Sequence, residues 1–133
     1  MAIRNEWYLT YMTKLPAGLE RFVAQQILEH RGKDMAIRRE RLVAMAASRF
    51  SDIQEVDRTV RRAIEKLRED GWLVGMSHNG DGYYLITSKE EYETFRDQYV
   101  KRAYTIIEKA NQMDAVARRV FSEPIAPIQV SLF

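Results

Sequence analysis

Three arginines lie close together in the segment VDRTVRRAIEKLREDG, which begins at Val56. Arg61 and Arg62 follow Arg58 by three and four residues, a spacing that places all three on one face of a helix. Thr59 lies at the edge of that face. A guanidinium group pairs through two parallel hydrogen bonds with a phosphate or with the edge of a guanine. The residue types and their spacing therefore indicate a surface for an anionic partner.

The charge of the chain is uneven around this segment. The net charge is only +2, but residues 31–68 carry a net charge of +5 and the remaining residues a net charge of −3. Three acidic side chains, Glu55, Asp57 and Glu65, interleave with the arginines and would repel phosphate. The alternative interpretation is an ordinary solvated helix face.

Apolar residues at helical spacing predict the elements that precede the arginines. A first helix is expected in PAGLERFVAQQILEHRG, where Pro16 suits the opening turn. The short run KDMAI predicts one isolated strand, and RRERLVAMAAS predicts a second helix. Residues 1–15 form an apolar arm without a clear period.

The arginines themselves lie in a third predicted helix over residues 51–71. Asp52 is its expected N-cap, and Glu55, three residues later, closes a capping box. Two β-rich runs follow, WLVGM and YYLIT, and the turn-forming residues NGDG between them predict a β-hairpin. The predicted fold is mainly α-helical with this small β-hairpin.

The order of helix, strand, helix, capped helix and hairpin resembles the winged helix-turn-helix family of DNA-binding domains. The resemblance covers residues 19–87, and its carriers are ERLVAMA, VDRTVRRAIEKLREDGWL and GMSHNGDGYYLI. It implies that the third helix enters the major groove and that the hairpin is the wing. The connection SRFSD before the third helix is longer than is typical of the family. The expected DNA-contacting residues are Arg38, Arg39, Arg41, Arg58, Thr59, Arg61, Arg62, His78 and Asn79.

A long helix is predicted over residues 88–121, with Ser88 as its N-cap and Glu91 three residues later. Apolar residues recur along it at intervals of three and four residues, as in a coiled coil. This stripe predicts a homodimer, and the alternative is that the helix folds back on its own domain. The stripe consists of Ala103, Ile106, Ala110, Met113, Ala117 and Val120.

The last five residues of the expected tail (122–133) are QVSLF. They resemble the pentapeptide by which bacterial DNA polymerases and repair proteins dock on the sliding clamp. The matching residues are Gln129, Ser131, Leu132 and Phe133. In that family the glutamine forms a hydrogen bond in a small subsite, and the Leu-Phe pair fills an apolar pocket. The alternative is an apolar tail that packs on its own domain.

Other classes of function find little support in the sequence. The chain has no cysteine, its two histidines (His30 and His78) are far apart, and it has no glycine-rich phosphate loop. We therefore expect no metal, no cofactor and no enzymatic activity. No apolar run approaches the roughly 18 residues of a membrane span, and Arg4 and Glu6 interrupt any signal peptide. The expected location is the cytoplasm of a bacterial or phage-infected cell, in association with the nucleoid.

These observations give four expected segments: the arm (1–15), a winged-helix domain (16–87), the long helix (88–121) and the tail. The predicted function is binding of double-stranded DNA in bacterial or phage replication, with docking on the sliding clamp through the tail. One alternative is a transcriptional repressor with an incidental tail. A second alternative is a clamp-binding adaptor or inhibitor that does not bind DNA.

Overall fold

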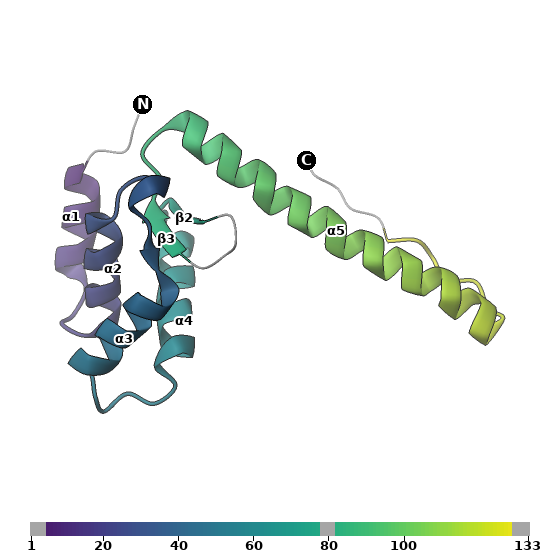
Figure 1. The fold of residues 1–133 in the computed structure, drawn as a ribbon, viewed down its shortest axis with the longest axis horizontal. Helices are drawn as coiled ribbons and strands as arrows, with labels where there is room; N and C mark the ends of the chain where they lie inside the picture. The colour runs from purple at the N-terminus through teal and green to yellow at the C-terminus, as the bar shows by residue number, and fades with distance from the viewer. Residues whose placement is uncertain (1–4, 78–81, 129–133) are drawn as a thin grey trace. The chain divides into compact units, whose positions relative to one another are not determined.

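The computed structural model describes residues 5–77 and 82–128 (Figure 1). It divides the chain into two units, Met1–Phe95 and Arg96–Phe133, and the boundary falls within the long C-terminal helix α5 (Lys89–Phe121). The described chain is mainly helical, with a small three-stranded antiparallel sheet. This confirms the predicted fold class in outline.

Helix α2 (Leu19–Glu29) is the centre of the first unit. It contacts helices on several sides: α1 (Asn5–Lys14), α3 (Arg39–Arg49) and α4 (Val56–Glu69). Phe22, Val23 and Ile27 are buried in the core, as their spacing predicts. The helix begins three residues after Pro16, with Gly18 as its N-cap, so the predicted opening turn at Pro16 is wrong.

Most of the N-terminal arm, for which the sequence predicts no clear element, forms helix α1. Tyr8 is buried, and its ring packs edge-on against Trp72 with a centroid distance of 4.7 Å. The Tyr11 hydroxyl donates a hydrogen bond to Asp70 at the end of α4. Helix α1 is therefore part of the core of the first unit.

Helix α4 begins at Val56, with its N-cap three residues later than the predicted Asp52, and the expected capping box is wrong. Glu55 occupies the N-cap in a left-handed conformation (φ 51°) and makes no side-chain capping bond. Its carbonyl accepts hydrogen bonds from the amide and the hydroxyl of Thr59, at 3.0 and 3.1 Å. Phe50 and Ile53 pack against the core, so residues 50–55 turn to bury these two side chains instead of extending the helix.

The sheet joins the isolated strand to the hairpin. Its strand order is β1 (Ile37–Arg38), β3 (Gly82–Leu85), β2 (Val74–Met76), and both pairings are antiparallel. Tyr83 of the central strand pairs with Ile37 on one side and Met76 on the other. The ring of Tyr84 crosses Gly75 so closely that a Cβ there would lie 2.5 Å from it. A side chain at this position of β2 would require the Tyr84 ring to move.

Helix α5 starts at the predicted cap. The Ser88 hydroxyl oxygen accepts a hydrogen bond from the amide of Glu91 at 3.1 Å. The carboxylate of Glu91 in turn accepts hydrogen bonds from the amides of Thr87 and Lys33, both at 3.0 Å. Lys33 opens the short 3₁₀ helix η1 (Lys33–Met35), so these bonds fix the first turn of α5 to the first unit.

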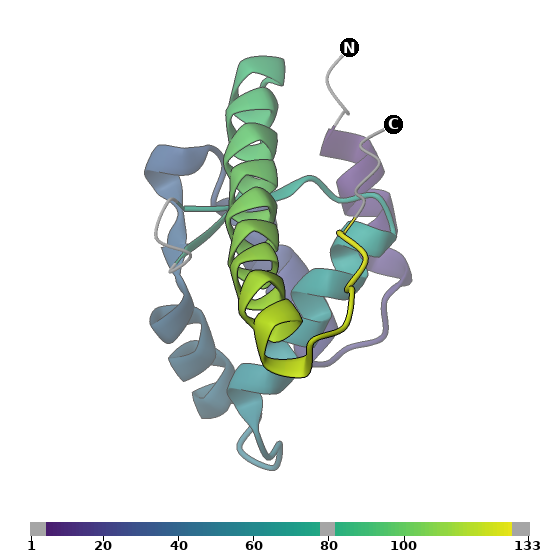
Figure 2. The ribbon, with the colours of Figure 1, turned by 90° about the vertical axis from the view of Figure 1, so that its right-hand side faces the viewer.

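Within the second unit, the chain turns back beside the last turns of α5 after Phe121 (Figures 1 and 2). The Arg118 guanidinium donates hydrogen bonds from Nε and Nη2 to the carbonyl of Ile125, at 3.1 and 2.9 Å. No residue of α5 is fully buried in the described structure.

Candidate nucleic-acid interface

Helix α4 has a buried face and an exposed face, as its sequence predicts. Val60, Ala63, Ile64 and Leu67 are buried. Arg58, Arg61 and Arg62 are exposed, and Thr59 is half-buried at the edge between the two faces. The first two turns of the exposed face are therefore rich in guanidinium groups.

The acidic neighbours of these arginines form only loose ion pairs with them. Arg58 lies 3.6 Å from Glu55, and Arg61 lies 3.6 Å from Asp57. The side chains of the two arginines are 58% and 54% exposed, and an exposed pair of this kind contributes only about 0–1 kcal/mol. Arg58 can therefore exchange its carboxylate for a phosphate at little cost, whereas movement of Arg61 would leave the buried Oδ1 of Asp57 without its ion-pair partner. Arg62 has no ion pair with another residue of the described chain.

Positive charges from two helices act on the Tyr83 hydroxyl of the central strand β3. Burial raises the pKa of the Tyr83 hydroxyl, and the positive charges of Arg39 and Arg61 partly oppose this rise. Arg39 belongs to the first turn of α3 and Arg61 to α4, so both guanidinium groups act on the same hydroxyl of β3. The packing of α3, α4 and the sheet thus brings predicted residues together that are far apart in sequence.

Arg68 was not singled out in the sequence, although it acts at the same place. Its charge also acts on the Tyr83 hydroxyl, and its Nε donates a hydrogen bond to the carbonyl of Val74 at 3.0 Å. Its guanidinium lies over the ring of Phe95, 5.9 Å from the centroid. Arg68 therefore joins α4, β2 and the first turns of α5. A half-buried arginine at the end of a charged helix carries no sequence signal for this role.

The remaining basic candidates flank the start of α3. Arg38 is its N-cap in an extended conformation and is exposed, Arg39 is half-buried, and Arg41 is exposed. His78 and Asn79, the candidates at the hairpin turn, lie outside the described residues, as do Gln129, Ser131, Leu132 and Phe133. The structure therefore describes the arginines of α3 and α4, two helices that pack against each other, and does not describe the other two groups.

The apolar stripe of α5 is largely exposed. Ile106, Met113 and Val120 are each 67% exposed. Ala103 is exposed, whereas Ala110 and Ala117 are half-buried. A helix of this length normally covers such residues with another surface, because contiguous exposed apolar patches are uncommon in monomeric proteins.

Comparisons of the chain with protein-family models, with curated proteins and with solved structures found no match. Across residues 5–77 and 82–128, no group of acidic or histidine side chains is placed to hold a metal ion. The helices in the same part of the chain are too short or too polar to cross a membrane.

Proposed function

We propose that the chain is a winged-helix protein that binds duplex DNA, with α4 as the helix that enters the major groove. The arrangement of elements supports this proposal. A helix, a short strand and two further helices precede a two-stranded hairpin, and the short strand pairs with the second strand of the hairpin. In the family that this order resembles, the helix at the position of α4 makes most base contacts.

The observation that carries the proposal is the gathering of guanidinium groups on the outer side of α4. Arg58, Arg61 and Arg62 are exposed over two turns, and Arg39 of α3 acts on the same tyrosine as Arg61. A helix fits the major groove, where Arg61 and Arg62 can pair with base edges or with the flanking phosphates. Arg38 and Arg41, exposed at the start of α3, would hold the phosphate backbone, and such contacts fix the register without reading the sequence.

Affinity for random-sequence duplex as a function of salt tests this proposal. A surface that neutralises phosphates releases counterions, so the logarithm of the affinity falls with the logarithm of salt concentration by about 0.9 for each phosphate neutralised. We expect a slope of several units for the intact chain. Absence of duplex binding at low salt would favour the adaptor alternative, in which the same fold binds protein.

We further propose, from the sequence QVSLF, that residues 129–133 dock on a bacterial sliding clamp. An extended peptide loses little ordering entropy on binding and anchors through one buried aromatic side chain. Together with DNA binding, this contact would place the protein at replicating DNA, because two modest affinities for linked partners reinforce each other. The expected setting is bacterial or phage replication.

Calorimetric titration of a purified clamp with the intact chain tests the clamp proposal. The control is a variant with Leu132→Ala and Phe133→Ala, which keeps the body of the protein unchanged. We expect binding only for the intact chain. Equal binding by both proteins would show that the pentapeptide is not part of the clamp interface. Loss of DNA binding in the variant would show that the tail contributes to DNA binding or to the stability of the folded domain.

A homodimer through α5 completes the proposal. Ile106, Met113 and Val120 recur every seven residues, and the alanines between them are small enough for a second helix to approach closely. Their exposure supports pairing with another copy of the helix.

A further inference from the structure

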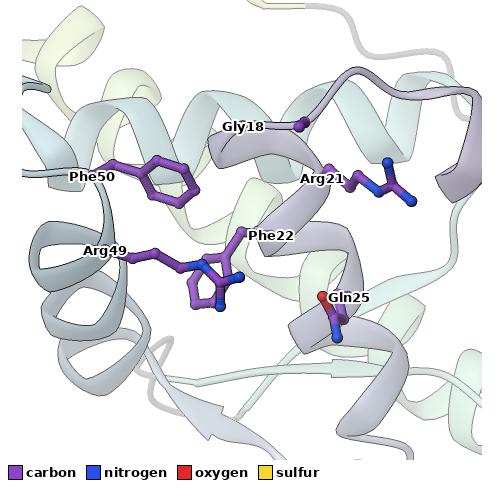
Figure 3. A pocket seen from close by; sticks show the side chains of 7 residues that line it. Gly18, Arg21, Phe22, Gln25, Arg49 and Phe50 are labelled. Atoms are coloured by element: carbon purple, nitrogen blue, oxygen red, sulfur yellow. The ribbon is translucent and has the colours of Figure 1, made fainter.

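A small cavity lies between the start of α2 and the end of α3, outside the arginine face of α4. Its volume is about 270 Å³. Its lining includes two aromatic rings, two guanidinium groups, one amide and a glycine of the backbone: Phe22, Phe50, Arg21, Arg49, Gln25 and Gly18 (Figure 3). Pockets for drug-sized ligands begin at about 300 Å³. The cavity therefore has room for one substituted ring.

The apolar part of the lining is a pair of rings. Phe22 and Phe50 meet edge to face, with a centroid distance of 5.9 Å and an interplanar angle of 65°. Phe22 is buried, and Phe50 is half-buried in the connection between α3 and α4. Aromatic rings prefer this edge-to-face arrangement, so a third ring can pack against the pair in the same manner.

The polar part of the lining is positively charged. The Arg49 guanidinium lies over the Phe22 ring, 5.3 Å from its centroid, and Arg21 extends from the first turn of α2 (Figure 3). None of the described residues that line the cavity is acidic. Of the two acidic residues of α2, Glu20 pairs with Lys66 at 3.2 Å, and Glu29 accepts a hydrogen bond at 3.4 Å from Gln25, which itself lines the cavity. Nothing in the lining compensates the two guanidinium groups.

We propose that this cavity binds a small aromatic carboxylate, with the ring of the ligand against Phe22 and Phe50 and its carboxylate on the Arg49 guanidinium, while Arg21 adds positive charge at the rim. A carboxylate accepts two parallel hydrogen bonds from a guanidinium, which a neutral group cannot replace. The aromatic ring of the ligand matches the phenylalanine side chains of the lining, and its negative charge matches the guanidinium charge. The inference does not depend on DNA binding, since none of its residues belongs to the exposed face of α4.

Four probes separate the two parts of the site in the intact protein. Benzoate carries ring and charge, benzamide the ring alone, and cyclohexanecarboxylate the charge with a non-aromatic ring. Inorganic phosphate carries charge alone. Titrations followed by NMR of the Gly18, Phe22 and Phe50 amides should show saturable shifts with benzoate. We expect binding about tenfold weaker for benzamide, because the charged hydrogen bonds are lost, and weaker binding for the other two probes.

Single substitutions test the named arginines. Arg49→Gln should weaken benzoate binding about fivefold to tenfold, and Arg21→Gln should weaken it to a smaller extent, whereas Lys14→Gln, which removes one exposed charge outside the cavity, should leave it unchanged. Equal affinity for benzoate and benzamide would overturn the proposal, as would phosphate binding as tightly as benzoate. The probe comparison uses the unmodified chain, so it decides the question even where a substituted protein fails to fold.

Discussion

Helices α4 and α5 both carry an apolar stripe among many charged residues, but the two stripes differ in burial. In α4 the stripe is buried, with Val60 and Ile64 at 0% and 1% exposure. In α5 the corresponding residues, such as Ile106 and Met113, are each 67% exposed. The apolar residues of α4 thus stabilise its own unit and leave its arginines on the surface. Those of α5 are left exposed on the surface of the helix.

The largest expected difference is in stability. Ile64→Ala should lower the free energy of unfolding by about 2–5 kcal/mol, because it leaves a cavity in a close-packed core. Ile106→Ala should change it by at most about 0.5 kcal/mol, measured at protein concentrations where the chain is monomeric. Urea unfolding monitored by tryptophan fluorescence measures both values. A comparable loss in Ile106→Ala would show that the stripe of α5 is covered within the chain.

The second difference is in self-association. Ile106→Asp combined with Met113→Asp places two charges on the α5 stripe, and burying a charge without a partner is costly. We expect the dimer dissociation constant to rise at least about a hundredfold, since four apolar side chains lose their burial, each worth about 1.5–3 kcal/mol. Sedimentation equilibrium measures this change. Lys101→Asp with Arg119→Asp, two exposed positions away from the stripe, is the matched control.

A smaller effect concerns the C-terminal end of α4, which Tyr11 holds through its bond to Asp70. Tyr11→Phe removes this hydrogen bond and should lower the free energy of unfolding by about 1 kcal/mol at neutral pH. Thermal unfolding of the two proteins measures the difference. An unchanged midpoint would mean that α1 holds α4 through its rings alone.

The same tyrosine predicts a dependence on alkaline pH. Burial, followed by the bond to Asp70, raises the pKa of Tyr11 to about 12 from its usual value near 10. A raised pKa means that the folded state retains the proton longer, so the stabilisation is complete below pH 10 and is lost as the pH rises toward 12. Burial raises the pKa values of Tyr8 and Tyr83 in the same direction. In an absorbance titration at alkaline pH, the tyrosine ionisation with the highest pKa should therefore be missing in Tyr11→Phe.

The sequence predicts α4 well because one strong helical period separates its apolar residues from its arginines. It predicts the start of α4 poorly, since Asp52 and Glu55 have capping spacing but Phe50 and Ile53 are drawn into the core. The sequence does contain a helical period for α1, because Tyr8, Tyr11 and Leu15 are three and four residues apart. The cavity beside Phe22 could not be predicted, because Arg21 and Arg49 come to line one cavity only through the packing of α2 against α3.

The most direct test of the central claim, that the exposed face of α4 binds DNA, is the salt dependence of duplex affinity in an Arg61→Ala, Arg62→Ala variant. Both side chains are exposed, so the variant should fold normally. If each arginine neutralises one phosphate, the slope of log affinity against log salt falls by about 1.8 relative to the intact chain. Lys101→Ala with Arg119→Ala removes the same charge from α5 and should leave the slope unchanged. A slope in the α4 variant equal to that of the intact chain would contradict the account.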